Sequence, residues 1–279
     1  MDKQSVWSMA ELVDEYCEYL ETCENRRIAT GMPVIDLALG GGMLPGEVIV
    51  ILGKAGVGKT SVALNLAHGA ATASPGRGVL IVSLEMGRAA ITERLAQLTL
   101  ALDRGRLVER IRTDVGGVRA MLSQHLPGVR VCDSCYTLTE INALVAELGP
   151  QVVVLDHLGW VRTGDSRIDV GSYERSSRII RDLQAMAKQN SFALVALQQI
   201  SRKGGYPYAP VTLEDARDSG VIEETADFVV GLHRTATSTD HGQPLGVSIL
   251  KNRRGPSEIE ADLLLESATY RVSEVANVG

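Results

Sequence analysis

The residues with the clearest chemical meaning form a glycine-rich stretch, Gly53-Lys-Ala-Gly-Val-Gly-Lys-Thr60. The spacing Gly-x-x-x-x-Gly-Lys-Thr is typical of a loop whose backbone N–H groups close around phosphate oxygens. Lys59 is then expected to reach the β- and γ-phosphates, and the Thr60 hydroxyl to ligate Mg²⁺. The pattern predicts a site for ATP and Mg²⁺ formed by Gly53, Gly56, Gly58, Lys59, Thr60 and Ser61.

Three polar residues, Glu85, Asp156 and Gln198, each follow a short apolar run that has the character of a buried strand. In parallel sheets, ligand sites form at the carboxyl ends of the strands. We expect Asp156 to hold Mg²⁺ through water, Glu85 to polarise the attacking water, and Gln198 to hydrogen-bond the γ-phosphate. Each residue alone could be an ordinary polar strand end. Together with the glycine loop they predict one catalytic site for nucleotide hydrolysis.

Apolar segments that alternate with helical patterns must position these groups. Short apolar runs at 47–52, 79–82, 152–155 and 192–197 predict buried strands, and helical periodicity occupies 60–72, 87–100, 137–148 and 172–189. Strands that alternate with helices indicate a mostly parallel sheet covered on both faces. The last apolar runs, at 228–232, 245–250 and 259–265, are joined by turns and predict antiparallel strands. The predicted fold class is therefore α/β, with a P-loop core.

The first 27 residues carry the pattern of a separate amphipathic helix. Ser8-Met-Ala-Glu11 has the spacing of a capping box, and apolar residues follow at helical intervals for about four turns. We therefore divide the chain into an N-terminal helix, residues 1–27, and an ATPase domain, residues 28–279. The helix either folds back on its own domain or docks on a neighbouring subunit, and the sequence leaves both arrangements open.

Composition and charge limit the classes of protein to which the chain can belong. Its 279 residues are 45% hydrophobic and 22% charged, which is ordinary for a globular domain with a full core. It has neither an apolar run near ~20 residues nor a signal peptide, so we expect a cytoplasmic protein without a membrane partner. The net charge of −6 leaves nucleic acid possible, because binding depends on local cations. Cys132 and Cys135 have the spacing of half a zinc site without a second pair, which favours a structural or incidental role.

Several short segments, taken with the glycine loop, resemble one known family. They are Thr30-Gly-Met-Pro-Val-Ile-Asp36, Ser83-Leu-Glu-Met86, Asp156-His-Leu158, Ala196-Leu-Gln-Gln199, Ala216-Arg-Asp-Ser-Gly220 and Lys251-Asn-Arg-Arg-Gly255. Over roughly residues 28–273 the chain resembles the ATPase domain of DnaB-type replicative helicases, within the RecA-like superfamily. Asp156-His-Leu158 departs mildly from the usual Asp-Tyr-Leu of that family. The resemblance implies a RecA-like fold and ATP hydrolysis in a hexameric ring that acts on single-stranded DNA.

The resemblance also implies roles for residues near the C-terminus. Lys251 and Arg253 would stabilise the γ-phosphate charge in the site of the neighbouring subunit, although a solvent-exposed basic hairpin is the alternative. Arg254 is an additional cation without an assigned role, and Tyr270 either stacks on the nucleotide base or lies in the core. The N-terminal helix stands where the family has its inter-subunit linker. Without the family's N-terminal collar domain, the chain resembles a minimal form, and we expect it to come from a phage or mobile element.

Two segments are candidates for contact with single-stranded DNA. Arg202 and Lys203 lie near two tyrosines in the stretch after the fourth predicted strand. Cations there can contact phosphates and tyrosines can stack on bases, whereas an ordinary exposed loop is the alternative. Arg217, Asp218 and Gly220 match the segment with which the family follows the strand backbone, and Gly220 would allow close approach. These five residues form the predicted DNA contact.

The leading hypothesis is a ring-forming DNA helicase driven by ATP hydrolysis in replication. The first alternative is a recombination ATPase similar to RadA or RecA, which binds DNA without processive unwinding. It is less favoured because the chain carries Ser-Leu-Glu-Met and lacks an N-terminal zinc module. A structure-specific nuclease on the same fold would need an independent metal–carboxylate cluster, which the sequence does not supply. The segment Arg217 to Gly220 counts against a signalling ATPase resembling KaiC.

Overall fold

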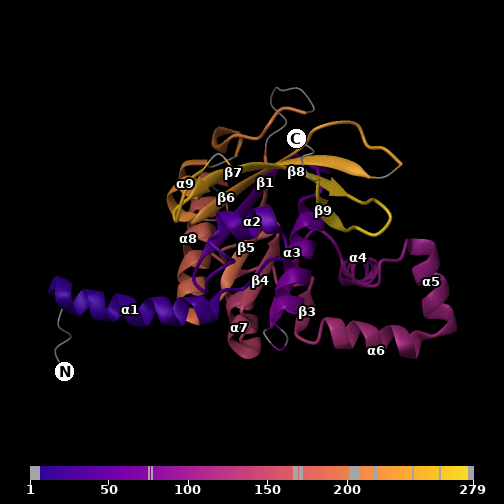
Figure 1. Cartoon of the computed structure of the whole chain (residues 1–279), viewed down its shortest axis with the longest axis horizontal. Coiled ribbons are helices and arrows are strands. Elements are labelled where there is room, and N and C mark those ends of the chain that lie inside the picture. Colours follow the sequence, from indigo (N-terminus) through magenta and orange to yellow (C-terminus); the bar gives the residue numbers. More distant parts are fainter. Residues whose placement is uncertain are drawn as a thin grey trace.

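The apolar runs of the sequence become neighbouring strands of one sheet in the computed structural model (Figure 1). The structure describes residues 7–74, 76, 78–165, 169, 172–200, 208–216, 219–240, 242–257 and 259–275, without the side chains of residues 23, 24, 172–174 and 219. In this part of the chain the sheet has nine strands in the order β3-β2-β4-β5-β1-β6-β7-β8-β9. The strands are β1 (Val48–Gly53), β2 (Val79–Ser83), β3 (Val129–Cys132), β4 (Val152–Asp156), β5 (Ala193–Gln199), β6 (Phe228–Arg234), β7 (Gln243–Asn252), β8 (Glu260–Leu265) and β9 (Val272–Glu274).

Strand direction changes once along the sheet. The strands from β3 to β6 pair in parallel, and β7, β8 and β9 continue the sheet in antiparallel pairs. This arrangement confirms the predicted α/β class with antiparallel C-terminal strands. β1 lies between β5 and β6, so the glycine loop that follows it opens at the middle of the carboxyl edge. Every residue of β1 is buried, as expected for a strand that helices cover on both faces.

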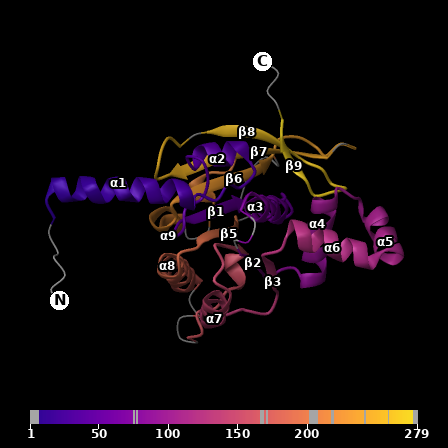
Figure 2. The same cartoon turned by 60° about the horizontal axis from the view of Figure 1, so that its bottom comes forward.

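Helices cover the two faces of the parallel part of the sheet (Figure 2). Their bounds are α1 (Met9–Arg26), α2 (Pro33–Ala38), α3 (Lys59–Ala73), α4 (Arg88–Leu100), α5 (Arg104–Thr113), α6 (Val115–His125), α7 (Leu138–Leu148), α8 (Ser172–Asn190) and α9 (Ser219–Thr225). One apolar core joins the sheet to α2, α3 and α4. The other joins it to α7, α8 and α9. None of the helices in the described ranges has the length and apolarity that crossing a membrane requires.

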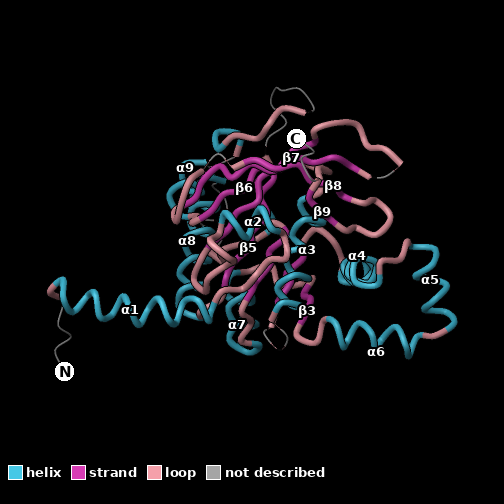
Figure 3. The backbone as a smooth tube through the Cα atoms, viewed as in Figure 1, coloured by secondary structure: helices cyan, strands magenta, loops and turns pink. Residues whose placement is uncertain are grey.

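The helices α5 and α6 are among those that were not predicted from the sequence. They form an arm that α4 connects to the sheet (Figure 3). Asp103 and Asp114 cap them by accepting hydrogen bonds from backbone N–H groups of the first turns, at 2.9 and 2.8 Å. Each helix buries a single hydrophobic residue, Leu107 in α5 and Val118 in α6. With so little apolar periodicity, the sequence pattern gave no signal for a helix here.

The helix α1 extends away from the sheet (Figure 1). Its predicted capping box is present, since Ser8 Oγ accepts from Glu11 N at 3.3 Å and Glu11 Oε2 accepts from Ser8 N at 2.8 Å. Trp7 just before the helix is exposed, and so are the large apolar side chains along it, namely Met9, Leu12, Val13, Tyr16, Tyr19 and Leu20. In this single chain, therefore, the apolar face of α1 is not folded back on the domain that follows.

Candidate nucleotide-binding site

The glycine loop joins the central strand β1 to α3 in a conformation that glycine adopts readily. Gly56 and Gly58 have φ angles of +72° and +114°, which residues with a Cβ rarely adopt. A Cβ on Gly58 would also lie 3.1 Å from Leu265 Cδ2. Lys59 begins α3 directly after the loop, so the free N–H groups of the first helical turn are available to an anion there. This geometry can bind the phosphates of a nucleotide.

The Lys59 ammonium is buried under the loop. Its Nζ donates hydrogen bonds to the carbonyl oxygens of Gly53 and Lys54, both at 2.9 Å. Burial lowers the pKa of Lys59, while the carboxylates of Asp156 and Glu85 favour its charged form. A phosphate in the loop would compete with the two carbonyls for this ammonium. The lysine is thus already held where the sequence predicted a phosphate contact.

The Thr60 hydroxyl and the Asp156 carboxylate meet at the start of α3. Thr60 Oγ1 donates to Asp156 Oδ2 at 2.6 Å, and Asp156 is only 3% exposed. Burial raises the pKa of Asp156, and the hydrogen bond from Thr60 partly counteracts this shift. Hydroxyl and carboxylate oxygens are ligands that Mg²⁺ prefers, so the pair fits the metal that the sequence predicted. Ser61, the next residue of α3, is buried.

Glu85 lies at the same edge, directly beyond β2. Ser83 at the end of β2 pairs with Asp156 of β4, and its Oγ donates to the Met86 carbonyl at 2.7 Å, which closes the turn around Glu85. The Glu85 side chain is 56% exposed, and its Oε2 lies 3.7 Å from His157 Nε2. An exposed carboxylate beside the phosphate loop can accept a proton from water. The tertiary structure therefore brings Glu85 and Asp156 together, as the sequence predicted.

Gln198 was predicted to hydrogen-bond the γ-phosphate, but the strand pairing indicates that the next residue, Gln199, has the position facing the glycine loop. In the pairing of β5 with β1, Gln199 lies opposite Gly53 and Gln198 lies opposite Leu52. Side chains alternate between the two faces of a strand, and Leu52 belongs to the core on the α8 face. Gln198 accordingly lines a small cavity with residues of α8 and α9. Gln199 has the strand position that faces α3 and the glycine loop, and the sequence analysis missed it.

Two side chains from distant strands fasten the glycine loop, and neither was predicted. Arg234 at the end of β6 donates from Nη2 to the Gly56 carbonyl at 2.8 Å. Gln243 at the start of β7 donates from Nε2 to the Val57 carbonyl at 2.8 Å. Both hydrogen bonds occupy carbonyl groups of the loop, which leaves its N–H groups for a ligand. No sequence signal marks these residues, because only strand pairing brings them to the loop.

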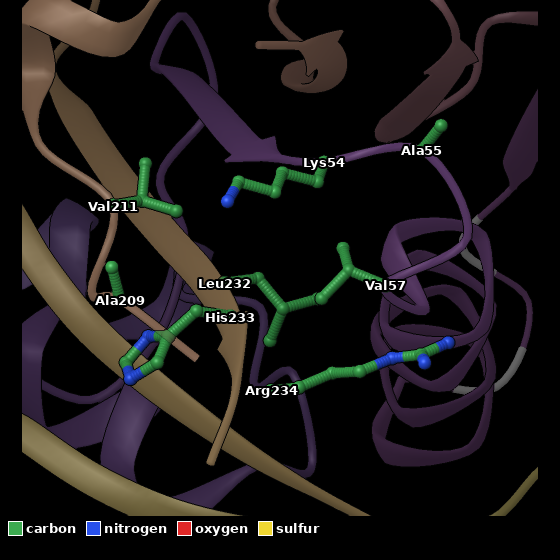
Figure 4. Close-up of a pocket in the computed structure, with 8 residues that line it drawn as sticks. All are labelled: Lys54, Ala55, Val57, Ala209, Val211, Leu232, His233 and Arg234. Atoms are coloured by element: carbon green, nitrogen blue, oxygen red, sulfur yellow. The ribbon is translucent and has the colours of Figure 1, made fainter. Parts of the chain in front are cut away.

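A pocket of about 200 Å³ lies between the glycine loop and the end of β6 (Figure 4). Its lining consists of Lys54, Ala55, Val57, Ala209, Val211, Leu232, His233 and Arg234. Burial lowers the pKa of His233, and its Nδ1 has no hydrogen-bond partner within the described ranges. The pocket thus combines an apolar wall with two cationic side chains beside the proposed phosphate site.

The predicted trans-acting cations, Lys251 and Arg253, lie at the other end of β7. Lys251 Nζ donates to the Ala226 carbonyl at 2.7 Å and to a second carbonyl in the last turn of α9. Arg253 donates from Nη1 to Asp227 Oδ1 at 2.9 Å. Lys251 pairs with Val229 of β6, which in turn pairs with Val50 of β1. Both cations therefore lie toward the amino end of β1, whereas the glycine loop follows its carboxyl end. Within one chain they cannot reach the phosphate site.

Arg254, for which the sequence suggested no role, ties this hairpin to the start of β1. Its Nη2 donates to Glu47 Oε2 at 2.6 Å and to the Gly42 carbonyl at 3.2 Å. The guanidinium also lies 5.0 Å from the centre of the Phe228 ring. Burial raises the pKa of Glu47, and Arg254 opposes that shift. Arg254 therefore has a structural role in holding the hairpin.

Tyr270 lies beside α3 in the turn between β8 and β9. Its carbonyl oxygen accepts a hydrogen bond from Asn65 Nδ2 at 2.8 Å, and the Arg94 guanidinium stands 4.8 Å from the centre of its ring. Cation–π contact of this kind favours a fixed ring position. Tyr270 is partly exposed, so its ring is not a core side chain. Its predicted stacking on a nucleotide base stays a prediction.

Most predicted DNA-binding residues, Arg202, Lys203, Arg217 and Asp218, lie outside the described residues. Gly220 is described, in the exposed first turn of α9, and a Cβ on it would meet no atom of the described residues within 4 Å. Packing against this part of the chain therefore does not require glycine there.

The cysteines Cys132 and Cys135 are free thiols. Burial, followed by the neighbouring Cys132, raises the pKa of Cys135 to about 12, so this thiol is protonated at neutral pH.

Comparison with curated proteins identifies relatives of the chain. The replicative helicase DnaB of Leifsonia xyli is 30% identical over 245 residues, which cover 83% of this chain and 52% of the relative. The replicative helicase DnaC of Bacillus subtilis is 30% identical over 267 residues, or 88% of this chain and 57% of the relative. The chain thus spans about half the length of the curated relatives it matches.

Solved structures share the fold. The ATPase domain of G40P has a TM-score of 0.75 at 22% identity, and the match covers 98% of this chain and 100% of that domain. A DnaB-like replicative helicase, described with its primase interactions, has a TM-score of 0.74 at 20% identity over 96% of this chain and 67% of that one. The family model of the DnaB-like helicase C-terminal domain matches residues 27–273. The chain therefore belongs to the family of DnaB-like helicase C-terminal domains.

Proposed function

We propose that this chain is the motor of a ring-forming DNA helicase, which hydrolyses ATP with Mg²⁺ and moves along single-stranded DNA to separate duplex strands in replication. The observation that carries the proposal is the contact of Thr60 with Asp156 at 2.6 Å beside the buried Lys59. A hydroxyl, a carboxylate and an ammonium at the end of a glycine loop are the groups that bind a magnesium nucleotide. Family membership supports the same activity.

In hydrolysis, water attacks the γ-phosphorus and the bond to the β–γ bridging oxygen breaks, which releases ADP and inorganic phosphate. The loop N–H groups and Lys59 hold the phosphates. Glu85 accepts the proton of the attacking water, and Gln199 takes the role first expected of Gln198 as a hydrogen-bond partner of the γ-phosphate. Magnesium, when bound, neutralises charge on the phosphates, and Thr60 and Asp156 supply oxygens for it, the latter through water.

A second copy of the chain supplies the other half of the site in this proposal. Lys251 and Arg253 lie too far from the glycine loop of their own chain, so they stabilise the developing charge in the site of a neighbour. Head-to-tail contacts of this kind close into a ring when the rotation between subunits permits. The relatives of the chain include replicative helicases, and a hexamer is the ring that we propose.

The helix α1 is the element that we propose to link subunits. Its exposed apolar side chains need a partner surface. The helix α1 contains six acidic residues and one basic residue, Arg26, and is therefore negatively charged. The helix α5 contains four arginines and one acidic residue, Glu109, and is positively charged. Ile111 and Val115 on the α5–α6 arm are exposed as well. Opposite charge and exposed apolar groups on both elements support docking of α1 on the arm of the next subunit.

The DNA contact is proposed from Arg202, Lys203, Arg217, Asp218 and Gly220. In the sequence, Arg202 and Lys203 come shortly after β5. Arg217 and Asp218 precede α9 in the sequence, and Gly220 lies in its first turn. At the other end of α9, Arg253 donates to the Glu224 carbonyl, and Lys251 donates to the Ala226 carbonyl just beyond the helix. DNA in the ring channel would therefore contact segments directly joined to both halves of the ATP site. This connection supports a motor in which hydrolysis moves DNA.

A paired assay tests the proposed function. ATP hydrolysis and the separation of a forked duplex are measured with and without single-stranded DNA, with Lys59→Ala as the inactive control. We expect hydrolysis that single-stranded DNA stimulates, together with strand separation that requires ATP. Hydrolysis that ignores DNA would contradict the motor, and DNA binding without strand separation would instead support the recombination alternative.

A further inference from the structure

Glu85 needs an orienting partner if it is to act as a base. A general base must stand within hydrogen-bond reach of the proton it accepts. The Glu85 side chain is 56% exposed and follows the last residue of β2 in a turn, so neither packing nor helix geometry fixes its torsions. Within the described ranges its one ion-pair contact is with His157, at 3.7 Å between Oε2 and Nε2. His157 is therefore the group that can set the direction of the carboxylate.

A hydrogen bond to the His157 ring determines which of its two nitrogens carries the proton. The backbone N–H of Gly159 donates to His157 Nδ1 at 3.1 Å. Because Nδ1 accepts this bond, the neutral imidazole carries its proton on Nε2, and Nε2 faces the carboxylate. The ring is held in place, since its side chain is only 15% exposed and the Trp160 ring lies 6.2 Å away. Burial lowers the pKa of His157, while Glu85 and Asp156 act in the opposite direction.

Gly159 makes this ring position possible. A Cβ at Gly159 would lie 2.7 Å from His157 Cε1 and 2.9 Å from Nδ1, which is closer than atoms can approach. The glycine therefore serves the imidazole in two ways, because it donates the fixing hydrogen bond and leaves room for the ring. Replacing Gly159 by alanine would displace the imidazole without removing it.

We propose that His157 is a positioning residue, whose Nε2–H hydrogen-bonds one oxygen of Glu85 and directs the other oxygen toward the water that attacks the γ-phosphate. The inference rests on the proposed function. The distance of 3.7 Å needs to shorten by less than 1 Å to become a hydrogen bond, and such contacts commonly tighten when substrate binds.

The test compares His157→Phe, which keeps a flat ring but has no donor, with His157→Gln, whose amide Nε2 can replace the imidazole donor. The kcat and KM of ATP hydrolysis, the affinity for a fluorescent ATP analogue and the Tm are measured for each. We expect His157→Phe to lower kcat on the order of tenfold to a hundredfold with unchanged nucleotide affinity. His157→Gln should recover kcat to within about threefold of wild type, and Gly159→Ala should resemble His157→Phe.

A structural role alone would lower the Tm and the nucleotide affinity of both histidine variants, and glutamine would not rescue kcat. Wild-type kcat in His157→Phe would overturn the proposal, as would an equal loss in His157→Gln at unchanged Tm. If the phenylalanine variant fails to fold, Gly159→Ala provides the same comparison with the imidazole present.

Glu85→Gln separates the inference from the function on which it rests. If this variant hydrolyses ATP at the wild-type rate, the proposed base is wrong whatever the His157 variants do. If it is inactive while His157→Phe keeps the wild-type kcat, only the positioning role fails. When both assignments hold, the double variant Glu85→Gln with His157→Phe should have the same kcat as Glu85→Gln alone. The reason is that the effects of residues that act as a unit are not additive.

Discussion

The two halves of the proposed site differ in how far a single chain completes them. The phosphate half is buried and already bonded, with Lys59 on two loop carbonyls and Thr60 on Asp156. The other half, which we call the finger half, consists of Lys251 and Arg253 at the far end of β7. Lys251 is half-buried and Arg253 is exposed, and they bond to Ala226 and Asp227 of their own chain, directly after α9. One half is thus built into the core, whereas the other lies away from the glycine loop of its own chain.

This difference suggests that one half determines nucleotide affinity and the other the rate of ATP hydrolysis. Groups that hold the phosphates through the whole cycle can be fixed by the core, because they act in the ground state and the transition state alike. The cations of the finger half are useful mainly when charge develops on the γ-phosphate. If a neighbouring chain supplies them, as we propose, hydrolysis depends on assembly. A single chain should therefore bind nucleotide well and hydrolyse it slowly.

The largest expected effect tests whether the halves belong to different chains. Lys59→Ala and Arg253→Ala should each lower the rate of hydrolysis by roughly 10³-fold. In an equal mixture, about one quarter of the interfaces would join an intact Lys59 to an intact Arg253 from the neighbour. Steady-state hydrolysis of the mixture should then rise far above either variant alone. A mixture no more active than its components would place both halves in one chain or remove the finger from the mechanism.

The next effect sharpens the boundary of the phosphate half. Gln199→Ala should lower kcat by about a hundredfold, because it removes a side chain that faces the loop. Gln198→Ala serves as the matched control and should change kcat by less than about threefold, since its side chain faces α8. Single-turnover hydrolysis measures both. Equal losses would mean that the alternation of faces in β5 does not decide the contact with the γ-phosphate.

A third comparison concerns how the finger hairpin is anchored. Arg254→Met leaves Glu47, whose side chain is 14% exposed, without its cation, and we expect the free energy of unfolding to fall by about 2 kcal/mol. Arg178→Met breaks an ion pair of the same 2.6 Å distance on an exposed helix face and should change it by less than about 0.5 kcal/mol. Urea denaturation of both variants compares them. Similar losses would deny that burial sets the value of the Arg254 contact.

The smallest effect is a pH dependence of stability that comes from α3, the helix that begins at the phosphate half. Burial lowers the pKa of His68 in α3, so the unfolded chain binds the proton more readily than the folded one. Stability is then complete above the unfolded pKa of about 6.5 and decreases as the pH falls below it, by at most about 1.4 kcal/mol per pH unit. His68→Gln should flatten the decrease in unfolding free energy between pH 7 and 5.5. A profile identical to wild type would show that His68 titrates alike in both states.

Local patterns were sufficient for much of the fold and for part of the site. The strand, glycine loop and helix around Lys59 are contiguous, so their sequence signal is contained in about 25 residues. The capping box at Ser8 could also be predicted from the sequence, because its two hydrogen bonds join residues that are three apart. The α5 and α6 helices were missed, since each buries one hydrophobic residue and the amphipathic pattern is weak. Their presence depends on caps and on packing against α4.

The sequence by itself determined that a phosphate-binding loop follows a buried strand, and that acidic residues end two further strands. Only the tertiary structure decided which glutamine of β5 faces the loop, because a shift of one residue exchanges the faces of a strand. It also decided that Arg234 and Gln243 fasten the loop, and that Lys251 and Arg253 lie away from it. These contacts join residues far apart in the chain, and the order and pairing of the strands set which of them meet.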